Sequence, residues 1–282
     1  MRALIGFFVL TFAASWSFWI GAALLSGGSF GPSARFMAID RLLIYIGVFA
    51  PALVSLALTA RLQGREAMRA LLGQVLRLPQ QARWYVFALG FFPAVKLAAA
   101  ITERVVTGTW PNLADFPVLL LLPAIAISTP VQAGEEIGWR GYALPRLANR
   151  FGLPIAGIVL GVIWACWHLP FFFIPGSDNA GRSFPVYVLA VTSISVAMAW
   201  LYWRTGASLF IVMLMHAAID NEALLFASPA GLPNPFSLNT TLTAWLTAGC
   251  LAICAIYFLV QMSRAQYDLG STRRPERPAA TE

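Results

Sequence analysis

Charged residues are scarce in this chain: Asp, Glu, Lys and Arg make up 11% of its 282 residues, while 59% are hydrophobic. Soluble domains carry about 25% charged and about 45–50% apolar residues. The shortage of charge therefore excludes an ordinary soluble domain. A membrane helix needs about 20 apolar residues. Eight runs meet this need, at residues 4–25, 42–60, 84–101, 116–133, 153–174, 184–203, 207–226 and 242–262.

Cysteine and histidine are scarce as well. The three cysteines, Cys166, Cys250 and Cys254, fall inside expected spans without zinc-ribbon or disulfide spacing, so we interpret them as packing residues. The chain also lacks the HExxH pattern of most zinc proteases. Its two histidines, His168 and His216, each interrupt an apolar run. Ionisable groups at membrane depth cost free energy, about 2.5–3.5 kcal/mol for a charged residue on insertion scales, so we expect a function for them.

The basic residues lie in alternate loops, so the net charge of +7 indicates membrane topology and not a nucleic-acid partner. With the N-terminus in the cytoplasm, fourteen arginines lie in cytoplasmic segments and four in outer loops, and Lys96 lies within the third span. The positive-inside rule therefore predicts an all-α, polytopic membrane helical bundle of eight transmembrane helices. Both termini are expected to be cytoplasmic, and the expected location is the plasma or inner membrane.

Two segments outside the spans have patterns of their own. Between residues 61 and 83, leucines recur at roughly helical spacing with arginines among them, which predicts an amphipathic helix on the anionic inner leaflet. After Arg264 the chain is polar and contains proline. We therefore expect a transmembrane domain over 1–263, with its motif core at 116–226, and a disordered cytoplasmic tail over 264–282.

A carboxylate pair, Glu135 and Glu136, follows the fourth run and opens the sequence EEIGWR. Helix residues four apart share a face, so Glu136 is expected to pair with Arg140 while Glu135 faces a cavity as a general base. A salt-bridged cluster at a cytoplasmic helix end is the alternative. For Glu135 to meet His168, the fourth helix must continue past Arg140 toward Pro145. This arrangement predicts a polar cavity that opens toward the cytoplasm.

Each histidine has a characteristic neighbourhood. Trp164 and Trp167 precede His168 and are expected to exclude water around it, although a buried histidine that only satisfies a hydrogen bond is the alternative. Asp220 follows His216 by four residues, on the same helix face. A carboxylate in that position is expected to orient the imidazole and fix its tautomer.

In this order on successive spans, EExxxR, aromatic-xxx-His and His-xxx-Asp resemble the CPBP family of intramembrane proteases, the CAAX-prenyl-protease and bacteriocin-processing (Abi) family. The resemblance covers about residues 133–220 together with the eight-span layout. It implies an intramembrane endopeptidase similar to type II CAAX prenyl endopeptidases. The residues that match family positions are Glu135 (the water-activating glutamate), Glu136 (the second carboxylate), Arg140, His168, His216, Asp220 (Asn or Asp in the family) and Trp164 (where Phe is commoner).

The chemistry expected of these residues is hydrolysis of a peptide bond. Glu135 would deprotonate a water, His168 would bind or polarise it, and His216 would stabilise the oxyanion. The same three residues would also suit one zinc ion, whereas a metal-free glutamate mechanism needs no cofactor. Expected partners are membrane lipid and a peptide or protein substrate with a membrane-associated cleavage site. A non-catalytic immunity or regulatory protein and a proton-coupled transporter stay open as alternatives.

Overall fold

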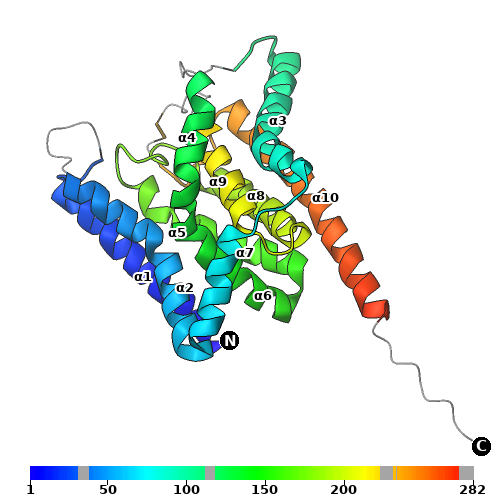
Figure 1. Ribbon diagram of the computed structural model, residues 1–282. Coiled ribbons are helices and arrows are strands. Elements are labelled where there is room, and N and C mark those ends of the chain that lie inside the picture. The colour runs from blue at the N-terminus through cyan, green and yellow to red at the C-terminus, as the bar shows by residue number, and fades with distance from the viewer. Residues whose placement is uncertain (31–37, 112–117, 223–230, 233, 273–282) are drawn as a thin grey trace, which may run out of the picture.

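The computed structural model describes residues 1–30, 38–111, 118–222, 231–232 and 234–272, and these form helices and connecting loops without a strand (Figure 1). The all-α prediction is therefore confirmed for the described residues. In chain order the helices and short 3-10 or π turns are α1 (Arg2–Leu25), α2 (Ala38–Gly73), η1 (Gln74–Leu76), α3 (Ala82–Thr107), η2 (Val118–Leu120), α4 (Leu121–Ser128), η3 (Thr129–Gln132), α5 (Ala133–Glu136), η4 (Ile137–Ala143), α6 (Leu144–Phe151), α7 (Leu153–Trp167), η5 (Leu169–Phe172), α8 (Phe184–Arg204), α9 (Leu209–Glu222) and α10 (Leu242–Thr272).

Not all eight expected spans are long helices. Among the described residues, five helical segments are long and apolar enough to cross a membrane: Arg2–Leu25, Ile39–Leu76, Ala82–Thr107, Phe184–Arg204 and Leu242–Arg264. Two expected spans are shorter apolar helices, Leu153–Trp167 and Leu209–Asn221. The remaining one, at 116–133, is divided among η2, α4 and η3. These three segments are the ones that lead to Glu135, His168 and His216.

The fourth segment continues as helix beyond Ala133, as the sequence required. From α5 the chain passes through η4 into α6 and stays helical to Phe151. The η4 segment is a π-helical turn, a feature that often occurs at functional sites. Gly138 in this turn lies against α2, where an added Cβ would come within 2.6 Å of Pro51 Cβ. The glycine therefore permits close packing of η4 on α2.

The segment expected to be amphipathic is helical from the end of α2 through η1. It is separated from the membrane-spanning part of α2 by a sharp turn at Gly64, whose φ of 89° is a conformation that glycine adopts readily. Leu71 on this segment is buried and lies against Gly141 of η4, while Leu76 is exposed. One side of this segment therefore packs on the bundle, and the other side is exposed.

The loops gather at two ends of the bundle. At one end, which we call the basic end, the α2–α3 connection meets the α8–α9 connection. The Arg77 guanidinium donates to the Gly206 carbonyl, the Ser208 hydroxyl donates to the Arg77 carbonyl, and the Tyr202 hydroxyl lies 2.8 Å from Gln74 Oε1. In Figure 1 α1 begins at the bottom of the view and α10 descends toward the lower right. The loops joined here are those expected to be cytoplasmic.

The opposite end, which we call the far end, joins the other set of loops. The Phe30 amide donates to the Pro175 carbonyl at 2.7 Å, and the Leu232 amide donates to the Gly181 carbonyl at 3.0 Å. The loop segments expected on the outer side are therefore in contact with one another. This separation agrees with the alternation of loops inferred from the arginines.

An aromatic layer lies beside the fourth segment and connects it to α1 and α7. The ring centroids of Phe7 and Trp139 are 5.6 Å apart, those of Trp139 and Trp167 are 5.6 Å apart, and those of Trp19 and Trp167 are 4.5 Å apart. The Trp16 indole donates to the Trp167 carbonyl at 2.8 Å. Phe7, Trp19, Trp139 and Trp167 are fully buried, so this layer packs α1, η4 and α7 together beside the polar centre.

α10 continues to Thr272, eight residues beyond Arg264, where the sequence placed the start of a disordered tail. That part of the expected tail is helical, which corrects the expected start of the disorder. Residues 273–282 lie outside the described part of the chain, and the domain boundary stays a prediction.

Candidate active site

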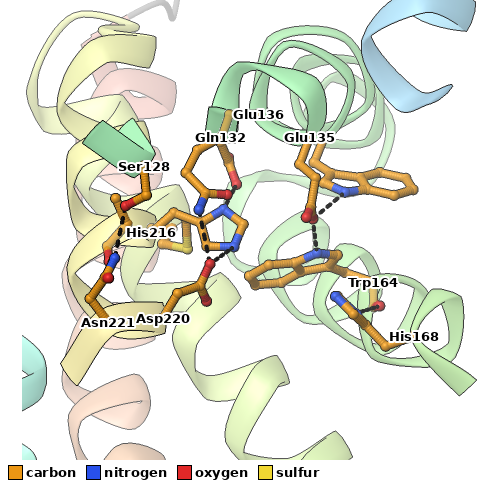
Figure 2. A network of polar contacts seen from close by, with 12 residues as sticks. Ser128, Gln132, Glu135, Glu136, Trp164, His168, His216, Asp220 and Asn221 are labelled. Atoms are coloured by element: carbon orange, nitrogen blue, oxygen red, sulfur yellow. Dashed lines mark hydrogen bonds and ion pairs between the residues drawn. The ribbon is translucent and has the colours of Figure 1, made fainter. Parts of the chain in front are cut away.

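The six residues that the sequence singled out come together from three parts of the fold, and five of them are labelled in Figure 2. Their positions are Glu135 and Glu136 on α5, Arg140 on η4, His168 directly after α7, and His216 and Asp220 on α9. They form two neighbouring networks, one around each glutamate. The two networks meet at the indole of Trp164.

Glu136 lies at the centre of the first network. Arg140 Nη1 donates to both of its carboxylate oxygens, at 2.8 and 3.0 Å, which confirms the expected pair. His216 Nδ1 lies 2.8 Å from Glu136 Oε1, so the carboxylate accepts from two partners. Glu136 and Arg140 are completely buried, and His216 is 4% exposed. Removing one partner of such a buried ion pair costs about 3–5 kcal/mol, because a charge is left unpaired.

His216 lies between two carboxylates, and the nearer one is not the one the sequence indicated. Asp220 Oδ2 is 3.6 Å from His216 Nε2, too long for a hydrogen bond, whereas Glu136 holds Nδ1 at 2.8 Å. The ring is therefore oriented chiefly by Glu136, which corrects the expectation that Asp220 does this. The four-residue spacing of His216 and Asp220 indicates only a contact within one helix. The contact with Glu136 could not be found in this way, because Glu136 is 80 residues from His216 in the sequence. Gln132 donates to Asp220 Oδ2 at 2.9 Å and holds that carboxylate beside the ring.

Glu135 forms the second network with two indoles. Trp164 Nε1 donates to its Oε2 at 2.7 Å, and Trp139 Nε1 donates to the same oxygen at 3.3 Å (Figure 2). Within the described residues, the other oxygen, Oε1, accepts no hydrogen bond from the protein. The residue is 6% exposed. One oxygen is thus fixed and the other is left for an external proton donor such as water.

His168 lies next to this carboxylate, with its own tautomer defined. Its Nδ1 is 3.0 Å from the Trp164 carbonyl oxygen, which can only accept, so Nδ1 carries the proton and Nε2 is the acceptor of the neutral ring. The ring centroids of Trp167 and Tyr187 lie 4.8 and 5.8 Å away. Trp164 and Trp167, the two aromatic residues that the sequence indicated, both lie next to the ring, with centroids 5.9 and 4.8 Å away, and the exclusion of water by them stays a prediction.

Trp164 connects all of these groups. Its indole N–H binds Glu135 and its carbonyl accepts from His168, while its ring centroid lies 5.1 Å from that of His216. The Arg140 guanidinium carbon lies 4.3 Å from the same ring, in the range of a cation–π interaction. One buried tryptophan therefore positions both histidines relative to Glu135.

The comparisons with known proteins agree with this arrangement. Residues 114–221 match the family model for "Type II CAAX prenyl endopeptidase Rce1-like" proteins. This segment is Rce1-like. A similar protein is the CAAX prenyl protease 2 of Methanococcus maripaludis, which is 25% identical over 237 residues, or 78% of this chain and 83% of that protein. The resemblance that the three motifs indicated is therefore confirmed, and all six residues of the two networks lie within the Rce1-like segment.

The expected zinc ligands in this segment, Glu135, His168 and His216, do not fit a metal site in their present arrangement. Glu135 Oε2 is held by two indoles, and both His216 nitrogens face carboxylates. Over the part of the chain that the structure describes, no group of three or more His, Cys, Asp or Glu side chains could hold a metal ion. We therefore derive no step through a metal.

Sequence reasoning missed two side chains of the site. Trp139, within EEIGWR, was not distinguished from a packing residue, and Gln132 precedes the motif by three residues. The contact of Trp139 could have been predicted, because Trp139 follows Glu135 by four residues, lies on the same helix face and has an N–H that can donate to the carboxylate. Gln132 had no such signal, because its partner Asp220 is 88 residues away.

Proposed function

We propose that this chain is an intramembrane endopeptidase in which Glu135 activates the water that hydrolyses a peptide bond. The observation that carries this proposal is the state of the Glu135 carboxylate. It is buried, one oxygen is fixed by two indole donors, and the other accepts no bond from the described residues. The similarity to type II CAAX prenyl endopeptidases indicates the same class of reaction.

In the first step Glu135 Oε1 takes a proton from a water whose oxygen attacks the carbonyl carbon of the scissile amide. His168 Nε2 accepts the second hydrogen of that water and holds it in line, because Nδ1 is occupied by the Trp164 carbonyl. The carbonyl π bond opens, and the oxygen becomes an oxyanion. In a site with little water this charge requires a preorganised donor.

His216 supplies that donor as an imidazolium between Glu136 and Asp220: Nδ1–H donates to Glu136, and Nε2–H, which has only the distant contact with Asp220, donates to the oxyanion. When the tetrahedral intermediate collapses, the C–N bond breaks and Glu135 returns its proton to the leaving amine. The products are a carboxylic acid, which keeps the second proton of the water, and an amine, and the site returns to its starting state. Arg140 holds the Glu136 carboxylate in place throughout by donating to both of its oxygens.

For the membrane arrangement we propose eight spans with both termini in the cytoplasm of the plasma or inner membrane. The separation of loops into two ends supports this arrangement, together with the fourteen arginines in one set of segments. The expected partners are membrane lipid and a peptide or protein substrate that is cut near the membrane.

The test compares peptides released by membranes that contain wild type, Glu135→Gln or Glu66→Gln, identified by mass spectrometry. Glu66 is exposed on α2, so its variant makes the same chemical change away from the site. General-base catalysis is worth about 10²–10⁴-fold, so Glu135→Gln is expected to lose most cleavage while Glu66→Gln retains it. A chelator arm of the same assay tests for a metal.

Unchanged peptide release by Glu135→Gln would contradict the proposal and favour the non-catalytic regulatory protein. Solute uptake into reconstituted vesicles without any peptide cleavage would favour the proton-coupled transporter instead. Immunoblots of the membrane fraction establish that the three proteins are present at equal levels.

A further inference from the structure

We infer that residues 65–76, which we call the surface segment, bind the headgroups of anionic phospholipids, and that this binding holds His216 in its catalytic position. The inference rests on the proposed function and adds a lipid that regulates the site. Sequence spacing indicated only an amphipathic helix at the membrane surface. The connection to the site follows from the contacts of the surface segment with η4 and α9 and from a strained turn at the start of α9.

One side of the surface segment presents two arginines and two leucines. Arg65, Arg69, Leu72 and Leu76 are spaced by four, three and four residues, which places them close to one helix face, and all four are exposed. None of the ion pairs found among the described residues involves either arginine. Arginines without a counter-ion beside exposed leucines are typical of a helix on an anionic bilayer, because the leucines enter the acyl boundary while the arginines face the headgroups.

The opposite side of the surface segment contacts both η4 and α9. Leu71 on this side is 6% exposed. A Cβ added to Gly141 of η4 would lie 2.6 Å from Leu71 Cδ1 and 3.2 Å from Leu209 Cδ1 at the start of α9. Gly141 follows Arg140, and Leu209 precedes His216 by seven residues, about two helical turns on the same face. Leu71 therefore touches the two elements that carry the first network.

The end of the surface segment leads into a set of bonds with the start of α9, which we call the Arg77 clasp. The Arg77 guanidinium donates to the Gly206 carbonyl, and the Arg77 carbonyl accepts from the Ser208 hydroxyl. Ser208 Oγ in turn accepts from the Ile211 amide at 3.3 Å, so this hydroxyl closes the first turn of α9. An interaction that fixes the surface segment therefore also fixes the helix that carries His216.

The turn that the Arg77 clasp holds is strained. Ala207 has a φ of 64°, in the left-handed region, which costs a residue with a side chain about 5- to 30-fold in population. The strain favours opening of the clasp. Two arginines at an anionic surface contribute about 30-fold in binding, which is enough to offset this strain. Anionic lipid therefore favours the closed clasp, in which His216 contacts Glu136.

Reconstitution of the full chain into lipid nanodiscs tests the inference. The nanodiscs contain phosphatidylcholine alone or phosphatidylcholine mixed with phosphatidylglycerol. Arg65→Gln/Arg69→Gln removes the charge of the exposed stripe, and Arg83→Gln/Arg150→Gln removes the same charge from exposed positions outside the surface segment. Hydrogen exchange measured by mass spectrometry reports on residues 65–76 and on the first turn of α9, and release of a cleaved peptide gives kcat.

Phosphatidylglycerol is expected to slow exchange in both regions of the wild type and of Arg83→Gln/Arg150→Gln. It is expected to raise kcat by up to about 30-fold, because a lipid shifts an equilibrium by no more than its own binding preference. Arg65→Gln/Arg69→Gln is expected to show neither response. Ser208→Ala removes the bond between the clasp and the Ile211 amide, so residues 65–76 are still expected to respond while the first turn of α9 responds less.

Equal exchange and equal kcat in the two lipids would overturn the inference, as would responses that Arg65→Gln/Arg69→Gln shares with the wild type. Slower exchange at residues 65–76 of the wild type without any change in α9 would also overturn it, because the lipid would then bind without reaching the site. If no peptide is cut in either lipid, the proposed function fails, while hydrogen exchange still decides whether the lipid controls α9.

Discussion

Replacement of Trp164 by phenylalanine tests whether the indole N–H controls the position of the catalytic glutamate. The Trp164 indole donates to Glu135 Oε2 at 2.7 Å, and this is the shorter of the two hydrogen bonds that the oxygen accepts. Phenylalanine keeps an aromatic ring beside Arg140 and leaves the backbone carbonyl to accept from His168. The substitution therefore removes only the indole N–H donor to Glu135 and part of the aromatic ring of residue 164.

The expected loss follows from the strength of that bond. A hydrogen bond to a charged group contributes about 1.5–3 kcal/mol net. At about 1.4 kcal/mol for each tenfold change in rate, Trp164→Phe is expected to lower kcat by about 10- to 150-fold. KM is expected to change little, because the indole contacts the carboxylate of the enzyme and not the substrate. Trp139→Phe is expected to lower kcat less, since its bond to Oε2 is 3.3 Å long.

Trp167→Phe is a matched control for this experiment. Its indole nitrogen is buried and has no hydrogen-bond partner among the described residues, so the same substitution removes ring area without a donor bond. Steady-state kinetics on a cleaved peptide and thermal unfolding in detergent are measured for the three variants. The reasoning is refuted if Trp164→Phe and Trp167→Phe retain the same kcat, or if the loss in Trp164→Phe is matched by a comparable loss of folded protein.

Two further substitutions test the packing of the site. Glu136→Gln is expected to lower stability by about 3–5 kcal/mol because Arg140 is left buried without its counter-ion, and combining it with Arg140→Met is expected to restore part of the loss in a thermal melt. Equal melting temperatures for the single and double variants would contradict this. Gly138→Ala is expected to cost about 1–3 kcal/mol by pressing against Pro51, whereas Gly6→Ala, whose added Cβ meets nothing within 4 Å, is expected to be neutral or slightly stabilising. A neutral Gly138→Ala would show that α2 can move away from η4.

The contacts that the sequence predicted are short-range ones. The pairing of Glu136 with Arg140 and the proximity of His216 to Asp220 follow from four-residue spacing on a helix, and both are found. The all-helical architecture follows from the requirement that backbone polar groups in a membrane be satisfied within the helix. The continuation of helix past Arg140 was also predicted, since the stretch before Leu144 contains no proline.

The contacts that decide the chemistry are long-range, and no periodicity indicates them. Trp164 reaches Glu135 across 29 residues, and His216 reaches Glu136 across 80. The sequence suggested that Trp164 would exclude water, but its indole N–H also fixes one carboxylate oxygen of Glu135. Such a role depends on the rotation of α7 about its axis, which hydrophobic spacing leaves undetermined when the helix is apolar on all sides.

The position of His168 in the bundle depends on where α7 ends, and an apolar run locates the end of a helix only approximately. The fifth run continues to residue 174, but α7 ends at Trp167 and the chain passes through His168 into η5. Seven residues of α-helix correspond to about 10 Å, a third of a hydrocarbon core about 30 Å thick. With a span to residue 174, His168 would lie inside a continuous helix. Because α7 ends at Trp167, His168 instead lies just beyond the helix, with its ring centroid 5.8 Å from that of Tyr187 in the first turn of α8.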